Sequence, residues 1–160
     1  MRLEHFEIKE MIGKGAFGRV YLVQNCFTEK VYAMKQLYKG SFNDRKMIQQ
    51  TLLEKQILCD EEHPFLMRMD YVFQTEDKIS FIMPFIKGGE FLTYLNMQPT
   101  NQFTEDQARF YVMQVALALG HLHKKNVCYR DLKAKNILMR EDGYLCLTDF
   151  GMAKMLEGDC

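Results

Sequence analysis

The sequence predicts an α+β fold, in which a mainly β region with one helix is followed by a mainly helical region. Two observations lead to this prediction. Short runs rich in β-branched and aromatic residues dominate the first half of the chain, and a long amphipathic pattern with a helical period dominates the second half. The pair Gly88-Gly89 interrupts the chain between them, so we place the hinge near residues 84–89.

The first region contains five segments with strand character and one helical segment. The strand segments lie between glycine-rich or polar turns, and they are residues 6–12, 20–23, 31–37, 69–73 and 79–85. Between the third and fourth of these, residues 42–60 have apolar side chains at three- and four-residue spacings, which predicts a helix. His63-Pro64 marks the end of that element, because the residue before a proline resists helical geometry.

The second region begins with a short predicted helix at residues 90–95. A longer helix follows, and Thr104 with Gln107 forms its expected capping box. The predicted core face of this helix is an apolar stripe made of Ala108, Tyr111, Val112, Val115, Leu119 and Leu122. Two short strands, at residues 137–139 and 144–147, are then joined through Asp142-Gly143, a pair that favours tight turns.

Composition and charge narrow the class of protein. The 160 residues are 48% apolar, enough for a core, and 21 basic residues balance 21 acidic ones, which gives no support to a nucleic-acid partner. No stretch approaches the roughly 20 apolar residues of a membrane span, and the N-terminus lacks a signal-peptide core. The five scattered cysteines form no CxxC pair, so we expect a soluble, cytoplasmic chain with reduced thiols. His121 and His123 would point to different faces of a helix, which disfavours a metal site there.

A glycine-rich run, Gly13-Lys14-Gly15-Ala16-Phe17-Gly18, indicates phosphate binding, because glycines let backbone N–H groups approach phosphate oxygens closely. The spacing alone also fits a dinucleotide-binding fold, which needs a following helix and an acidic residue about 20 positions on. Here a predicted strand follows instead, and Lys35 lies at about that distance. A glycine-rich hairpin followed by a strand lysine is typical of ATP-phosphate recognition. Glu54 on the predicted helix is the expected partner of Lys35.

A second cluster of polar residues, between 129 and 151, predicts phosphoryl transfer. In Asp131-x-Lys133-x-x-Asn136, Asp131 would orient a hydroxyl and accept its proton, and Lys133 would neutralise charge on the transferred phosphoryl group. Asn136 and Asp149, the latter followed directly by Phe150-Gly151, would bind Mg²⁺. Each of these residues taken alone could be an ordinary polar residue of a loop. Their combined spacing, however, is very rarely met by chance.

These motifs resemble the eukaryotic protein kinases, and specifically the serine/threonine kinases of the A, G and C group. The matching stretches, in chain order, are GKGAFGRV, VYAMK, HPF, KGGEFLTYL, TEDQARFYVMQVALALGHLH, YRDLKAKN and LTDFGMAK. The resemblance implies a two-lobed kinase-like fold. Residues 1–86 would form an ATP-binding lobe of five antiparallel strands and one main helix, and residues 87–160 would begin the helical lobe. It also implies ATP and Mg²⁺ as cofactors and Ser/Thr hydroxyls of protein substrates as acceptors.

The same resemblance assigns the nucleotide contacts by position. Met83 would guard the back of the adenine pocket, Pro84 would offer its backbone C=O to adenine, and Ile86 would offer its N–H. Glu90 resembles the ribose contact. The full set of expected nucleotide-binding positions is Ile12, Gly13, Lys14, Gly15, Ala16, Phe17, Gly18, Val20, Ala33, Lys35, Met83, Pro84, Ile86, Glu90, Leu138 and Thr148.

The chain departs from the family pattern at three places, the first being Pro84, where an acidic residue is usual. Ala134-Lys135 replaces the usual Pro-Glu, and a lysine there would repel basic residues of a substrate. The family pattern also continues beyond residue 160, so we expect part of a longer protein, an incomplete gene product, or a truncated form that needs an unknown regulatory partner. The leading interpretation is a protein serine/threonine kinase. The alternatives are a nucleotide-binding or regulatory module without turnover and, less favoured, a small-molecule kinase of related shape.

Overall fold

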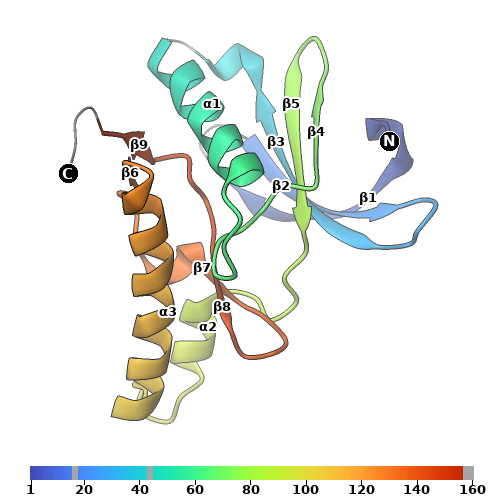
Figure 1. Cartoon of the computed structure of the whole chain (residues 1–160). Helices are drawn as coiled ribbons and strands as arrows, with labels where there is room; N and C mark the ends of the chain where they lie inside the picture. The colour runs from blue at the N-terminus through green and yellow to red at the C-terminus, as the bar shows by residue number, and fades with distance from the viewer. Residues whose placement is uncertain (16–17, 43–44, 157–160) are drawn as a thin grey trace. The chain divides into compact units, whose positions relative to one another are not determined.

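A computed structural model describes residues 1–15, 18–42 and 45–156 of the chain (Figure 1). It divides into two compact units, one made of residues 1–49 and 68–85 and the other of residues 50–67 and 86–160. The first unit is mainly β and the second is mainly helical. The predicted α+β class is therefore confirmed.

The first unit is built around one antiparallel sheet of five strands in the order β1-β2-β3-β5-β4, as the resemblance implied (Figure 1). Every segment with predicted strand character forms a strand, although β2 begins earlier and β4 begins later than expected. Two single-turn helices, η1 (Leu3–His5) and η2 (Lys39–Ser41), flank the strands. The strands are β1 (Phe6–Lys14), β2 (Gly18–Asn25), β3 (Val31–Tyr38), β4 (Tyr71–Gln74) and β5 (Lys78–Pro84).

The two faces of this sheet have different roles. Residues directly opposite each other in an antiparallel pair lie on the same face, and successive residues alternate between faces. One face carries the hydrophobic core of the unit, formed by Phe6, Val23, Tyr32, Met34 and Ile82. The residues between these, at the alternate positions of the same strands, point to the other face. Among the predicted nucleotide contacts of this unit, that second face includes Val20, Ala33, Lys35 and Met83.

The main helix of the first half, α1 (Arg45–Asp60), begins close to its predicted start and ends at the predicted residue. The buried side chains of α1 are those of Glu54, Ile57 and Leu58. A buried carboxylate is unusual on a helix, because burying an unpaired charge is costly. Glu54 is therefore the residue of α1 whose position most needs a functional or structural reason.

The second unit contains the long helix α3 and a set of short strands. The capping box is confirmed, since Gln107 N–H donates to Thr104 Oγ1 at 3.3 Å and Thr104 N–H donates to Gln107 Oε1 at 3.0 Å. The strands β6 and β9 pair with each other and were not expected, because two residues are too short to show a period. The elements are α2 (Phe91–Asn96), α3 (Glu105–Lys124), β6 (Val127–Cys128), η3 (Ala134–Asn136), β7 (Ile137–Met139), β8 (Leu145–Leu147) and β9 (Lys154–Met155).

The buried face of α3 differs from the prediction at one position. Val112 was expected in the core, and this is wrong, because its side chain is 65% exposed. The residues most buried on α3 are Gln114, Ala118 and Leu122. Val112 lies about 100° around the helix from its neighbour Tyr111, which places it at the edge of the stripe rather than inside it. Val112 was therefore assigned to the core only because it is apolar. Among the described helices, none has the length and apolar content to cross a bilayer.

Candidate active site

The glycine-rich run lies where β1 ends, at Lys14, and β2 begins, at Gly18. Gly13 lies opposite Val20 in the β1–β2 ladder, and Gly15 N–H donates to Gly18 O at 3.0 Å. A side chain on Gly18 would collide with the carbonyl oxygen of Gln36 on β3. A glycine is therefore required there by the close approach of two strands. Ala16 and Phe17, also predicted to contact nucleotide, lie outside the described residues.

The ladders of β2, β3 and β5 bring several predicted nucleotide residues onto one face. Val20 lies directly opposite Lys35, and Ala33 lies directly opposite Met83. Since Ala33 and Lys35 are two residues apart on β3, all four side chains share the face opposite the aromatic core. Three apolar side chains and one lysine amine on a single face suit a ring and an attached phosphate chain.

Two predicted nucleotide residues are not placed on that face by strand pairing. The β1–β2 register shifts between Met11 and Gly13, so Ile12 lies at an irregularity in the strand, and it is 43% exposed. Pro84 lies opposite Tyr32, whose side chain belongs to the core face. The role predicted for Pro84 needs only its backbone C=O, so the direction of its ring does not bear on it. Lys14, opposite Arg19, is at the end of β1.

In the second unit, two predicted catalytic residues, Asp131 and Lys133, converge with the predicted metal ligand Asn136. Lys133 Nζ lies 2.6 Å from Asp131 Oδ2, and Asn136 Nδ2 donates to the same oxygen at 2.8 Å and to the Asp131 backbone oxygen at 3.0 Å. The hydrogen bond from Lys133, aided by that from Asn136, holds the pKa of the Asp131 carboxyl below its usual value. Asp131 is therefore ionised at neutral pH and able to accept a hydrogen bond from a hydroxyl group.

The two predicted metal ligands lie at the open end of the β7–β8 hairpin, one before its first strand and one after its second. Asn136 immediately precedes β7, and Asp149 follows β8 by two residues. Thr148 N–H donates to Asn136 O at 2.9 Å, and Thr148 Oγ1 donates to the same oxygen at 3.2 Å. The hairpin pairing thus continues up to the residue before Asp149, which brings the two candidate ligands together from positions 13 residues apart in the chain.

The loop that contains Asp131 is fastened to the segment that contains Asp149. Tyr129 donates its hydroxyl hydrogen to Thr148 O at 2.6 Å, and its ring contacts Phe150 edge-on at 5.7 Å between centroids. Burial raises the pKa of Tyr129, so the phenol remains protonated and keeps this donor. Arg130 Nε donates to Met152 O at 2.8 Å. These contacts fix the two loops relative to each other.

Two residues of this site have left-handed backbone geometry. The φ angle is +65° at Arg130 and +57° at Asp149. For residues other than glycine such angles cost of order 1 kcal/mol, and they persist where surrounding contacts hold them. Both residues have neighbours in the network just described. Asp is among the non-glycine residue types enriched at such angles, whereas Arg is not, so nothing in the sequence indicated this geometry at Arg130.

The remaining predicted contacts in the second unit lie around β7. Glu90 and Leu138 form an antiparallel bridge, and Met139 N–H donates to Gly89 O at 2.9 Å. A side chain on Gly88 would collide with the carbonyl oxygen of Met139, so the chain after Ile86 passes very close to the hairpin. Ile86, Glu90 and Leu138 are thus brought into one neighbourhood. The predicted pairing of Lys35 with Glu54 joins residues of different units and stays a prediction.

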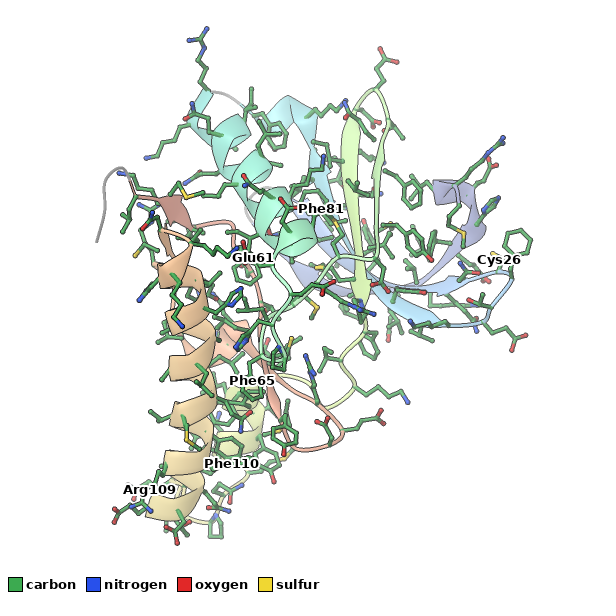
Figure 2. All side chains as sticks on the ribbon, viewed as in Figure 1. Cys26, Glu61, Phe65, Phe81, Arg109 and Phe110 are labelled. Atoms are coloured by element: carbon green, nitrogen blue, oxygen red, sulfur yellow. The ribbon has the colours of Figure 1, made fainter. Side chains whose placement is uncertain are left out.

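Sequence reasoning missed one close polar contact. No role was assigned to Glu61 from the sequence, and His121 was considered only as part of a disfavoured metal site. Glu61 is labelled at the end of α1 in Figure 2. Its Oε2 lies 2.7 Å from His121 Nε2, whereas His123 is exposed. The available signal was the helical spacing of His121 with Gln114 and Ala118, which places it on the buried side of α3.

Comparison with known proteins gives consistent matches over nearly the whole chain. The family model described as "Protein kinase domain" matches residues 6–160. A "RAC family serine/threonine-protein kinase homolog" of Dictyostelium discoideum is 44% identical over 149 residues, which cover 93% of this chain and 33% of that protein. The "Serine/threonine-protein kinase sgk-1" of Caenorhabditis elegans is 42% identical over 150 residues, 93% of this chain and 32% of that protein.

A human relative matches to the same degree. "Ribosomal protein S6 kinase alpha-1" of Homo sapiens is 42% identical over 153 residues, which cover 94% of this chain and 20% of that protein. This chain therefore spans a third or less of the length of these curated relatives.

Proposed function

Because this chain belongs to the protein kinase domain family, we propose that it contributes the ATP site and the catalytic loop of a protein serine/threonine kinase. The observation that best supports this is the grouping of Asp131, Lys133 and Asn136, with Asn136 joined to the residue preceding Asp149. A carboxylate, an amine and two oxygen ligands in one place match the needs of in-line phosphoryl transfer. The proposed reaction moves the γ-phosphoryl group of ATP to a Ser or Thr hydroxyl of a protein substrate.

Asp131 is proposed to orient the acceptor hydroxyl and accept its proton. Its pKa is low, so its part is mainly to align the hydroxyl and to receive the proton as the new bond to phosphorus forms. Lys133, which hydrogen-bonds the same carboxylate, is close enough to stabilise negative charge on the transferred phosphoryl oxygens. Each of these roles uses an atom whose position is fixed by a short hydrogen bond.

The donor set next to this carboxylate fits Mg²⁺. Carboxylate and amide oxygens are ligands that Mg²⁺ accepts, and both hydrogen bonds of the Asn136 side chain to Asp131 use its nitrogen, which leaves its amide oxygen for a cation. Asn136 and Asp149 would hold the ion, which would neutralise charge on the phosphates.

The first unit is proposed to bind the nucleotide. The shared face of Val20, Ala33 and Met83 would cover the adenine ring, and Lys35, oriented by Glu54, would reach the α- and β-phosphates. The backbone N–H groups of the glycine-rich turn would contact the phosphates. In this proposal residues 1–86 form the ATP-binding lobe and residues 87–160 the part of the second lobe that carries the catalytic loop.

Asp131→Asn in the full-length protein tests the proposal. The change keeps shape and removes the negative charge, so transfer to a Ser/Thr peptide should fall about 10²- to 10⁴-fold. ATP affinity, measured by calorimetry, should change little, because Asp131 is assigned to the acceptor side. Asp142→Asn, in the exposed turn of the β7–β8 hairpin, is the matched control.

Transfer by Asp131→Asn at the wild-type rate would refute the assignment of Asp131. Tight ATP binding by the wild-type protein without any measurable transfer would instead favour a nucleotide-binding or regulatory module. These outcomes separate the enzyme from the binding function that the sequence also allowed.

A further inference from the structure

The chain makes a tight turn between the predicted base contact, Ile86, and the predicted ribose contact, Glu90. Across this turn Gly89 N–H donates to Ile86 O at 3.5 Å, and the φ angle of Gly89 is +75°. A glycine is favoured at the last position of such a turn, because it adopts this angle without strain. The turn directs residues 89–90 along β7 in the second unit (Figure 1).

Backbone contacts join the residues after this turn to β7. Met139 N–H donates to Gly89 O at 2.9 Å. Glu90 forms an antiparallel bridge with Leu138, which lies opposite Cys146 in the β7–β8 ladder. Residues directly opposite each other share a face, so the side chains of Glu90 and Leu138 lie on the same side of this ladder. Backbone pairing therefore makes neighbours of the predicted ribose contact and one predicted adenine contact.

Gly88 lies directly against β7. A Cβ atom at Gly88 would collide with the carbonyl oxygen of Met139, and it would lie 2.9 Å from the carbonyl carbon of the same residue. Both atoms belong to the backbone of β7, which does not turn aside as the end of a side chain does. Gly88 is not in the left-handed region that Gly89 occupies, and a Cβ at Gly89 would have no atom within 4 Å. Glycine is therefore required at 88 for space and at 89 for conformation.

A nearby ion pair adds little to this arrangement. Lys87 Nζ lies 3.4 Å from Glu141 Oε1, and the two side chains are 66% and 69% exposed. Exposed pairs of this kind contribute at most about 1 kcal/mol. The backbone contacts of residues 88–90, and not the ion pair, therefore determine how close this segment lies to β7.

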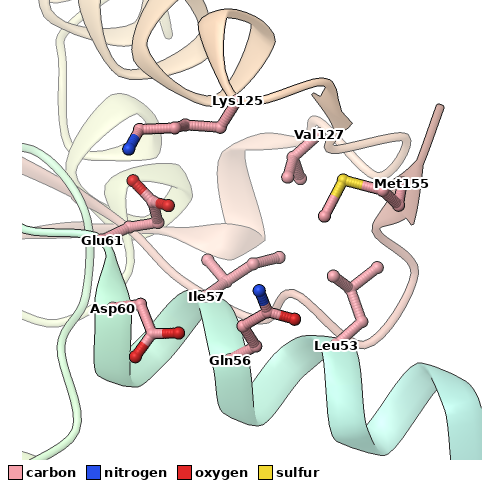
Figure 3. A pocket seen from close by; sticks show the side chains of 8 residues that line it. All are labelled: Leu53, Gln56, Ile57, Asp60, Glu61, Lys125, Val127 and Met155. Carbon is pink, nitrogen blue, oxygen red and sulfur yellow. The ribbon is translucent and has the colours of Figure 1, made fainter. Parts of the chain in front are cut away.

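The second unit has free space, but this space is not beside Gly88. A cavity of about 320 Å³ lies between α1 and the strands β6 and β9 (Figure 3). Its lining, within the part of the chain that the structure describes, includes no residue of 86–90 or of β7, and consists of Leu53, Gln56, Ile57, Asp60, Glu61, Lys125, Val127 and Met155. A side chain added at Gly88 would therefore push residues 86–90 away from β7.

The contacts of the candidate metal site do not involve the turn. Asn136 directly precedes β7, and Thr148 N–H donates to Asn136 O at 2.9 Å. These contacts belong to the β7–β8 hairpin and to the residues that flank it. A displacement of residues 86–90 would therefore move the predicted base and ribose contacts and leave the metal ligands, Asn136 and Asp149, in place.

We propose that Gly88 is a positioning residue for nucleotide binding: because it has no side chain, residues 86–90 pack against Met139 O, and this packing sets the position of the base and ribose contacts relative to the metal ligands. The proposal rests on the function proposed above, since Ile86 and Glu90 are assigned to ATP there. It predicts that a side chain at position 88 weakens recognition of the nucleoside and preserves recognition of the triphosphate.

Calorimetry on the full-length protein tests this separation. In Gly88→Ala the Kd of MgATP should rise about tenfold, because hydrogen bonds to the base and ribose are lost, whereas the Kd of magnesium tripolyphosphate should change by less than about twofold. In transfer assays KM for ATP should rise by a similar factor, with kcat within about twofold of wild type. Gly40→Ala is the matched control, because a Cβ there would have no atom within 4 Å, and it should leave both Kd values unchanged.

A second measurement uses the wild type and does not depend on the folding of a variant. Adenosine at about ten times its Kd should slow hydrogen exchange of the Met139 amide about tenfold, because bound nucleoside holds residues 86–90 against β7 and opposes the opening of the bond to Gly89 O. Tripolyphosphate at the same multiple of its Kd should leave this rate unchanged.

Three outcomes would contradict the proposal. They are an unchanged ATP affinity in a folded Gly88→Ala variant, equal losses of ATP and tripolyphosphate affinity in that variant, and equal protection of the Met139 amide by adenosine and tripolyphosphate. If Gly88→Ala does not fold, the exchange of Met139 decides. A wild-type protein that binds neither MgATP nor adenosine would instead reject the proposed function itself.

Discussion

The two compact units hold their candidate functional residues by different means. In the first, Val20 and Lys35 share a face because backbone ladders hold β2 and β3 in register. In the second, Asp131 is held by hydrogen bonds from the side chains of Lys133 and Asn136. The first unit should therefore tolerate side-chain changes that preserve the ladder, whereas the second should fail when one polar side chain is replaced.

The largest expected effect is in the second unit. Asn136→Ala removes both hydrogen bonds to Asp131 and the amide oxygen assigned to Mg²⁺, so kcat/KM should fall about 10²- to 10³-fold. The Mg²⁺ concentration needed for half-maximal rate should also rise. Asn96→Ala, at the exposed end of α2, is the control in steady-state assays. A loss of only a few-fold would mean that the side-chain network does not position Asp131.

The second largest effect is expected from a substitution that disrupts the backbone hydrogen-bond ladder of the first unit. Gly18→Ala would force a methyl group against Gln36 O and so separate β2 from β3, at a cost of about 2–3 kcal/mol in the free energy of unfolding. Gly15→Ala, three residues earlier in a position with no atom within 4 Å, should cost less than about 1 kcal/mol. Urea unfolding of the two variants measures the difference, and equal stabilities would contradict the argument.

A smaller effect concerns the choice of substrate by the second unit. Lys135 is exposed on η3, next to Asn136, and within the described residues it has no acidic partner. A free positive charge there should disfavour Arg and Lys near the acceptor hydroxyl of a peptide. Lys135→Glu should raise selection for Arg by about fivefold in a positional peptide library, with Lys124→Glu as the control. Strong selection for Arg by the wild type would refute this expectation.

The smallest effect is on stability below neutral pH. The folded state lowers the pKa of His63 from 6.5, so the unfolded chain binds a proton there first and stability is lost as the pH falls through about 6.5. His63→Gln removes this loss, and its Tm should drop less than that of wild type between about pH 7.5 and pH 5.5, by a few degrees at most. Thermal melts of His63→Gln and His123→Gln compare the buried and the exposed histidine.

The sequence predicted most of the fold because its elements are periodic and bounded by turn residues. The capping box at Thr104 and the ends of β7 were correct, since local chemistry alone determines them. β6 and β9 were missed because they exist only through pairing between distant residues. Val112 was misplaced because burial depends on what covers a helix and not only on its apolar residues.

The candidate site was predictable in its residues but not in its geometry. Spacing identified Asp131, Lys133 and Asn136. The side chains of Lys133 and Asn136 both reach Asp131 Oδ2 because η3 turns the chain between them, and η3 was not predicted from the sequence. The contact of Glu61 with His121 joins residues 60 positions apart, and periodicity carries no information about such pairs. Side-chain partners across that distance follow from tertiary packing alone.

The buried amide of Gln114 has a consequence for strand alignment. Its Oε1 accepts from Leu145 N–H at 2.8 Å, and its Nε2 donates to Phe110 O at 3.2 Å. Strands as short as β7 and β8 specify their own alignment weakly, and a slip by one residue would move Asp149 by about 3.3 Å and turn Leu145 outward. The hydrogen bonds of Gln114 to α3 and to β8 disfavour that shift in register. Glutamate lacks the donor and leucine lacks both groups, so the amide is the chemical requirement for correct alignment.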